Sequence, residues 1–235
     1  MSQPRQSAPS GGKSSSHKSA RRASDLGPKG RLTRQRLIEA LLALLDEKPL
    51  SQISVLDIAE RAETSPATFY LYFSNARAIA LAVSGEISQS TPAMFRILEP
   101  EWTERNAHES ALALVREYSA VWDRHRALLH ARNQAADEGD MAFLNARSAA
   151  LRPVITVMAG KIDGLTDEAA VPSDSAVALA SVLVMMLERV GTTSPQKRYN
   201  RRASYEDIVN AAALLIASML RIRPDGEVPG RLPSK

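Results

Sequence analysis

Apolar residues recur three or four positions apart along most of this chain, as they do on one face of an α-helix. Residues 32–48 show this spacing and Pro49 ends it, so we expect a first helix there. A second helix of about two turns should start at Ser54, which precedes Asp57 in a capping arrangement. Ser65 can cap a third helix after a short gap. Two short helices joined by a tight turn are typical of a helix-turn-helix.

The helical spacing continues through the rest of the chain, and no useful stretch alternates in the way a strand does. A fourth helix should start at Ser74 or Asn75 and end near Ser88, and an irregular boundary should follow it. Further helices are expected at about 104–124, 126–138, 140–163, 174–190 and 205–222. Pro153 should kink or divide the longest of them. The pattern therefore predicts an all-α protein.

Composition separates the ends of the chain from its middle. Residues 1–30 are rich in Ser, Gly and Pro and have almost no large apolar residues, so we expect a disordered arm. The whole chain of 235 residues is 44% hydrophobic, which is enough for a core. We expect a three-helix helix-turn-helix domain at 31–83 with a linking helix to about 90, a helical effector-binding and dimerisation domain at 91–223, and a flexible tail at 224–235.

Charge is unevenly distributed. Residues 1–36 contain nine basic residues and one acid, Asp25, which gives this segment a charge of +8, whereas the whole chain carries +4. The remainder is therefore at −4. A basic arm on a mildly acidic body is typical of a protein with one end facing phosphate. A solubilising tail would explain the same charges.

Several classes of function lose support. The chain has no cysteine, which excludes disulfides and thiolate sites. It has no 18-residue uncharged apolar run and no apolar N-terminal segment, so we expect a cytoplasmic protein with no membrane partner. His125 and His130 would lie on different faces of a helix, so we expect no metal site. No nucleotide-binding or hydrolase motif occurs, so we expect neither a cofactor nor an enzyme.

The stretch "SVLDIAERAETSPATFYLYFSNARAIALAV" resembles the DNA-binding region of the TetR family over about residues 33–83. The family pattern has an Asp-Ile-Ala-x-x-Ala helix, a Gly-Val-Ser turn and a recognition helix ending in Tyr-x-His-Phe. The resemblance implies an all-helical homodimeric regulator, usually a repressor released by a small molecule. Glu63 replaces the family's Gly, Tyr72 its His and Ala76 its Lys. If Glu63 takes the left-handed backbone conformation that Gly normally supplies, it stores strain on the order of 1 kcal/mol, which the fold should survive.

The third helix should present small and aromatic side chains to DNA. Phe69 and Phe73 are four residues apart and should be buried, whereas Tyr70 and Tyr72 leave that face for phosphate contacts or exposed packing. The absence of Arg and Asn from this helix favours methyl and hydroxyl contacts with thymine in an inverted-repeat operator. The candidate DNA-binding residues are Arg34, Ser54, Ser65, Pro66, Ala67, Thr68, Tyr70, Leu71, Tyr72 and Arg77. Arg77, next to Ala76, could supply the charge of the missing Lys.

A second set of residues could line an effector pocket. The candidates are Tyr118, Trp122, His125, Met158, Met185 and Glu188. The first three share one helical face, and the methionines would give pliable apolar walls. This mixture suits a small lipophilic ligand with one or two polar groups. The same residues could instead form an ordinary core.

The penultimate predicted helix contains "MMLERV", which with its surroundings resembles the TetR subgroup that includes the ethionamide-monooxygenase repressor. Glu188 lies within this apolar run, and if it is buried it needs a partner. Arg189 and the arginines of residues 197–202 are candidates. Surface exposure of Glu188 is the other possibility.

The last two predicted helices are apolar over more than one face, which favours a homodimer, with burial in a larger monomer as the alternative. We expect a sequence-specific DNA-binding transcriptional regulator, a repressor whose operator binding is released by a small lipophilic effector. Effector binding would change the spacing of the two recognition helices. The alternative is an effector-independent or architectural DNA-binding protein.

Overall fold

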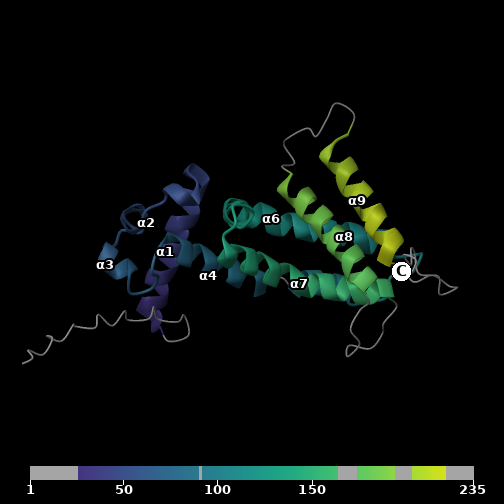
Figure 1. Cartoon of the computed structure of the whole chain (residues 1–235), viewed down its shortest axis with the longest axis horizontal. Helices are drawn as coiled ribbons and strands as arrows, with labels where there is room; N and C mark the ends of the chain where they lie inside the picture. Colours follow the sequence, from purple (N-terminus) through teal and green to yellow (C-terminus); the bar gives the residue numbers. More distant parts are fainter. Residues whose placement is uncertain (1–25, 90–91, 164–173, 194–202, 221–235) are drawn as a thin grey trace, which may run out of the picture.

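The computed structural model describes residues 26–89, 92–163, 174–193 and 203–220, and every element in these ranges is helical (Figure 1). The helices near the N-terminus are α1 (Pro28–Glu47), η2 (Leu50–Gln52), α2 (Val55–Arg61), α3 (Pro66–Phe69) and α4 (Ala76–Gln89). The others are α5 (Pro92–Leu98), α6 (Ala107–Asp137), α7 (Met141–Asp163), α8 (Asp174–Thr192) and α9 (Tyr205–Leu220). The all-α fold class is confirmed.

The four predicted N-terminal helices are present, and the second, third and fourth of them begin at the predicted caps. Ser54 Oγ accepts a hydrogen bond from the Asp57 amide at 3.1 Å, and the Asp57 carboxylate accepts one from the Ser54 amide at 2.8 Å. Asn75 Oδ1 caps α4 by accepting from the Ala78 amide at 2.8 Å. These bonds satisfy backbone donors that have no partner within the helix.

Three boundaries differ from the expectation. Helix α1 begins at Pro28, so the end of the expected disordered arm is helical; residues 1–25 lie outside the described ranges. Helix α5 occupies the expected irregular boundary. Helix α7 runs through Pro153 without division, although a proline removes one backbone donor from a helix. The expected tail at 224–235 also lies outside the described residues.

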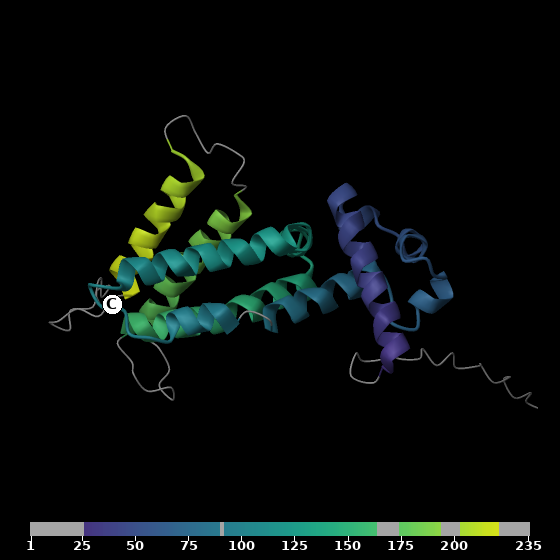
Figure 2. The same ribbon diagram turned by 180° about the vertical axis from the view of Figure 1, so that it is seen from behind.

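Helix α6 contains the break that the sequence placed between two helices. His125 has φ −127° and ψ 22°, which are not helical, and the helix continues on both sides of it. The first part of α6 packs among the C-terminal helices. The second part runs toward α1–α4, as Figure 2 shows.

The molecule has two apolar cores. The C-terminal core joins α5–α9 and includes Trp102 and Trp122. The N-terminal core joins α1–α4, and it also takes in Leu128 and Ala136 of α6 and Phe143 of α7. The C-terminal helices therefore contribute side chains to the N-terminal core.

Helix α8 is the one described helix that is long and apolar enough to cross a membrane by length and composition. In this structure α8 packs against α6 and α7, and Leu183, Val184 and Leu187 are buried there. Core helices of soluble proteins share this composition.

Candidate nucleic-acid interface and effector domain

The turn between α2 and α3 has the backbone conformation expected for the family's glycine. Glu63 has φ 51°, in the left-handed region, and it is the one non-glycine residue with positive φ among the described residues. The Thr64 amide donates to the Ala59 carbonyl at 2.9 Å, which ends α2. This conformation costs a non-glycine residue on the order of 1 kcal/mol. The condition considered from the sequence is met at Glu63.

Ser65 fixes the start of α3. Its Oγ accepts from the Thr68 amide at 3.1 Å and lies 3.0 Å from Thr68 Oγ1. Ser65, Pro66 and Ala67 are exposed, so the first turn of α3 is open to solvent. A helix start with open side chains can accept an anion such as a phosphate.

The aromatic residues of α3 divide as the spacing predicted. Phe69 is fully buried and Phe73 is nearly so, with ring centroids 6.0 Å apart. Tyr70 and Leu71 point outward, with 55% and 56% of their surfaces exposed. Tyr72 is half-buried. Its side chain packs against the N-terminal core and is partly exposed at the surface.

A lysine stabilises the start of α2. Lys48 Nζ lies 2.8 Å from Asp57 Oδ2. The hydrogen bond from Lys48, together with those from Ser54, lowers the pKa of Asp57 to about 2. Asp57 is therefore ionised at neutral pH. Its negative charge also interacts favourably with the positive, N-terminal end of the helix dipole.

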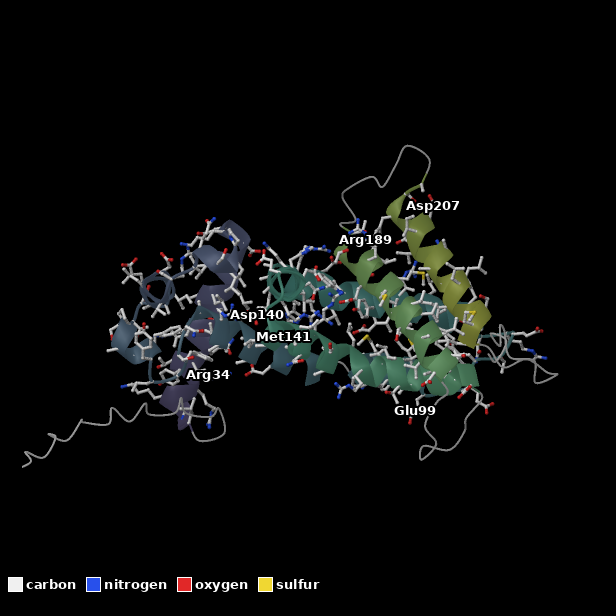
Figure 3. The ribbon with its side chains drawn as sticks, viewed as in Figure 1. Arg34, Glu99, Asp140, Met141, Arg189 and Asp207 are labelled. Atoms are coloured by element: carbon white, nitrogen blue, oxygen red, sulfur yellow. The ribbon has the colours of Figure 1, made fainter. Side chains whose placement is uncertain are left out.

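Two arginines expected at DNA have partners inside the chain. Arg34 pairs with Glu86 of α4 and stacks over Phe73, with Cζ 5.3 Å from the ring centroid. Arg77 pairs with Asp140, and its Cζ lies 5.5 Å from the Phe143 ring centroid. Figure 3 shows Arg34 beside the DNA-binding helices and Asp140 where they meet α7. Contact of either arginine with DNA stays a prediction, and in this structure both guanidinium groups have partners within the chain.

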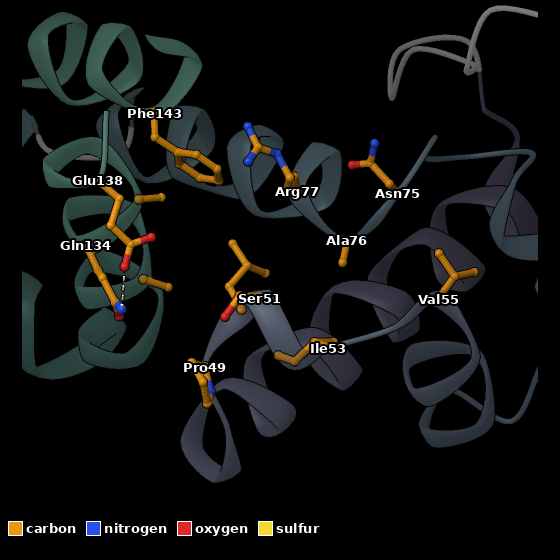
Figure 4. A pocket seen from close by; sticks show the side chains of 13 residues that line it. Pro49, Ser51, Ile53, Val55, Asn75, Ala76, Arg77, Gln134, Glu138 and Phe143 are labelled. Atoms are coloured by element: carbon orange, nitrogen blue, oxygen red, sulfur yellow. Dashed lines mark hydrogen bonds between the residues drawn. The ribbon is translucent and has the colours of Figure 1, made fainter. Parts of the chain in front are cut away.

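A cleft of about 290 Å³ lies where the two domains meet (Figure 4). Its walls come from η2, α4, α6 and α7. The lining residues include Ile53, Ala76, Arg77, Gln134 and Phe143. The volume of this cleft shows that side chains do not fill this part of the junction.

Three of the expected ligand residues lie in the C-terminal core. Tyr118, Trp122 and Met158 belong to one buried cluster, and Met158 is fully buried. Burial raises the pKa of the Tyr118 hydroxyl, so it stays neutral and can donate a hydrogen bond. The two cavities described here are lined by none of these three residues.

Gly191 of α8 allows Trp122 to fit. A Cβ atom at Gly191 would lie 2.4 Å from Trp122 Cδ1 and 2.8 Å from Cγ, distances too short for carbon atoms. The indole therefore fills the space that any other residue would need. The closeness of α6 and α8 at this point depends on the glycine.

His125 and Met185 do not join that group. The helical break at His125 interrupts the face that was expected to align it with Trp122, and His130 packs edge-on against Trp122 instead, at 5.3 Å. Burial lowers the pKa of both histidines. Met185 is 64% exposed, so the expectation that it forms an interior wall is wrong.

Glu188 is buried and fully paired. Its carboxylate accepts from Arg147 Nη2 at 2.6 Å and Nε at 3.3 Å, and from Asn133 Nδ2 at 3.3 Å. Arg132, also buried, has its Nη2 3.8 Å away. The Glu188 hydrogen bond raises the pKa of Arg147, whereas burial lowers that of Arg132.

The observed partners of Glu188 replace the expected ones. Arg189 is exposed on the outside of α8, and residues 197–202 lie outside the described ranges. The carboxylate and Arg147 also line an open hollow of about 560 Å³ together with Met185 and Arg189. Glu188 and Met185 therefore share a surface hollow, separate from the core that holds Trp122.

Comparison with known proteins decides the family. Residues 37–83 match the bacterial regulatory proteins of the tetR family, and residues 96–218 match the tetracyclin repressor-like C-terminal domain. The chain belongs to the TetR family.

Known proteins resemble this TetR-family chain in sequence and in fold. The HTH-type transcriptional regulator EthR of Mycobacterium tuberculosis is 28% identical over 147 residues, which are 62% of this chain and 68% of EthR. The fatty acid degradation regulator FadR of Bacillus halodurans has a TM-score of 0.56 at 18% identity, covering 85% of this chain and all of that one. FadR of Bacillus subtilis in complex with stearoyl-CoA has a TM-score of 0.58 at 16% identity, covering 80% and 99%. These structures show the fold.

The TetR-family chain is thus a DNA-binding transcriptional regulator. Among the described residues, no group of three His, Asp or Glu side chains could hold a metal ion. Sequence reasoning missed Arg132, Arg147, Asp140 and Phe143. Asp140 could be noticed as a cap after Gly139, but no signal in the sequence names its distant partner.

Proposed function

We propose that this regulator is a homodimeric repressor that reads an inverted-repeat operator with α3. The supporting observation is the exposure of Tyr70 and Leu71, two large side chains that directly follow α3 and belong to neither core. Exposed apolar groups on a helix-turn-helix are suited to contact with base edges. Phe69 anchors the helix from beneath.

Readout would come from small and apolar groups. Pro66, Ala67 and Leu71 offer carbon surface to thymine methyl groups, and the hydroxyls of Thr68 and Tyr70 bind phosphates or base edges. Such contacts distinguish fewer base pairs than bidentate Arg–guanine bonds. Discrimination between operators would therefore depend both on direct contacts with bases and on how easily each DNA sequence is deformed.

The dimer would form on α8 and α9. Exposed apolar side chains are concentrated on these two helices, at Val177, Val182, Met185, Leu214 and Leu215. Apolar surface of this kind on neighbouring helices favours an intersubunit helix bundle. Two-fold symmetry would place the recognition helices about 34–36 Å apart for successive major grooves.

The effector would be lipophilic and would enter between α6, α7 and α8. The domain core is rich in large apolar side chains, with Tyr118 as an uncharged donor. Trp122 and Met158 fill the interior, so a ligand has to displace them. That displacement would couple ligand binding to a change in the conformation of the domain. The stearoyl-CoA complex of the structurally similar FadR supports a long-chain compound as the first probe.

An effector-independent DNA-binding protein is the second candidate, and the packed interior favours it. Neither described cavity reaches Tyr118, Trp122 or Met158. Titrating stearoyl-CoA and palmitate into a protein–DNA complex separates the two. Release of DNA supports the effector-controlled repressor.

Selection of bound genomic fragments tests the main proposal. The full-length chain should enrich an inverted repeat, and Leu71→Ala should change the enriched sequence. Leu56→Ala is the matched control, because Leu56 is an equally exposed leucine on α2, the helix that should cross the backbone. It should leave the preferred sequence unchanged. Fragments enriched without a common sequence would reject specific readout.

A further inference from the structure

The turn between α6 and α7 is docked onto the DNA-binding domain. Gly139 has φ 91°, a conformation that lets the chain reverse sharply after α6. Asp140 follows and Phe143 lies in the first turn of α7. Both side chains face α4, the helix that connects the two domains (Figures 3 and 4).

Asp140 has a separate task for each oxygen. Oδ1 accepts from the Ala142 amide at 3.0 Å and so caps α7. Oδ2 pairs with Arg77 near the start of α4. The Asp140 side chain is only 12% exposed, so the carboxylate of this pair is largely shielded from water.

Phe143 makes the contact more than a surface ion pair. It is fully buried within the N-terminal core, and Arg77 lies over its ring. The guanidinium of Arg77 is more than half exposed, so the ion pair alone would contribute little. The buried ring and the stacked arginine together give the junction a defined geometry.

The same segment is tied to the rest of the effector domain. After the break at His125, Arg126 Nη1 donates to the Thr192 carbonyl at the end of α8, at 3.0 Å. On the other side of the break, Trp122 lies against Gly191 of α8. The second part of α6 therefore links the end of α8 to the turn that contacts α4.

We propose that Arg77, Asp140 and Phe143 form a junction latch that positions α4, and with it α3, on DNA. Arg77 is a positioning residue in this latch and does not bind a phosphate. The inference rests on the proposed function as a DNA-binding repressor.

Salt titration separates the latch from a phosphate contact. The variants are Arg77→Ala, Asp140→Asn and both together, in the full chain, with a fragment enriched from genomic DNA as probe. Asn at 140 keeps a side-chain oxygen for the α7 cap but removes the charge. Arg152→Ala, an exposed arginine on α7, is the control for loss of a positive charge.

The latch predicts that both single variants lose affinity by a similar factor, about 5-fold or more, and that the double variant loses no more than either. The slope of log K against log salt should stay at the wild-type value. A phosphate contact predicts the opposite: Arg77→Ala alone lowers the slope by about 0.9 for each contact, and Asp140→Asn has no effect. That result would overturn the latch.

Hydrogen exchange tests the latch without DNA. Asp140→Asn should speed exchange in the first turns of α4 while leaving α8 unchanged, because local opening follows the loss of local contacts. Unchanged exchange in α4 would overturn the latch. If the wild-type chain binds no genomic fragment, the proposed function is wrong. The hydrogen-exchange measurement still tests the latch, because it does not require DNA.

Discussion

The two ends of the molecule use different kinds of polar contact. Around α2 and α3, the side chains of Ser54 and Ser65 bond to backbone amides three residues away on the protein surface. In the effector domain, Glu188 reaches Arg147, 41 residues away in sequence, and the carboxylate is buried. One end is organised by local caps and the other by a long-range buried ion cluster.

This difference predicts how each end responds to substitution. An exposed cap contributes about 0.5–2 kcal/mol, and its loss can leave the remaining fold intact. Breaking a buried ion pair costs about 3–5 kcal/mol because the partner charge stays without compensation. Substitutions near α3 should therefore affect DNA binding more than stability, and substitutions near Glu188 should do the reverse.

The largest expected effect is that of Glu188→Gln. Removing the carboxylate charge leaves the buried Arg132 and the partly buried Arg147 without the anion that they share. The free energy of unfolding, measured by urea titration, should fall by about 3–5 kcal/mol. Arg189→Gln, on the exposed side of the same helix, is the control and should change it by less than about 0.5 kcal/mol. Equal effects of the two variants would contradict a buried cluster.

Gly191→Ala should have the next largest effect. The added methyl collides with the Trp122 ring, so the free energy of unfolding should fall by about 1–3 kcal/mol, with a shift in tryptophan fluorescence. Gly160→Ala is the matched control in α7, where a Cβ meets nothing within 4 Å, and the better helix former should be neutral or stabilising. A neutral Gly191→Ala would show that Trp122 is free to move.

Ser65→Ala should have a smaller effect on stability and a clearer one on binding. Loss of the cap lowers the free energy of unfolding by about 1 kcal/mol and loosens the start of α3. Ser204→Ala removes the same kind of cap from α9, where Ser204 Oγ accepts from the Asp207 amide at 3.2 Å. The two variants should lose similar stability, but operator affinity should fall only with Ser65→Ala. An equal loss of operator affinity in both variants would contradict a specific role of α3 in DNA recognition.

The part of the fold that depends on local signals could be predicted from the sequence. The caps at Ser54 and Ser65 and the left-handed Glu63 involve neighbouring residues, so the sequence contains all the information that determines them. Helix α5 was missed because Pro92 at its start looked like a loop signal, although proline also suits the first helical turn.

The long-range contacts could not be predicted in the same way. The sequence suggested that Glu188 needs a cation, but nearby arginines were considered and distant ones, Arg132 and Arg147, are the partners. Arg77 was assigned to DNA because of its position beside the expected lysine, and the fold instead turns it toward Asp140. Such pairings follow from how helices pack.

The most direct test of the central claim is a uracil scan of the selected operator. Each thymine is replaced by uracil, one at a time, which removes the methyl group and keeps base pairing. If Ala67 and Leu71 read thymine methyls, single replacements in each half-site should weaken binding by a measurable factor at symmetric positions, whereas Tyr70→Phe should weaken all sites alike. Unchanged affinity at every replaced thymine would contradict recognition by the apolar face of α3.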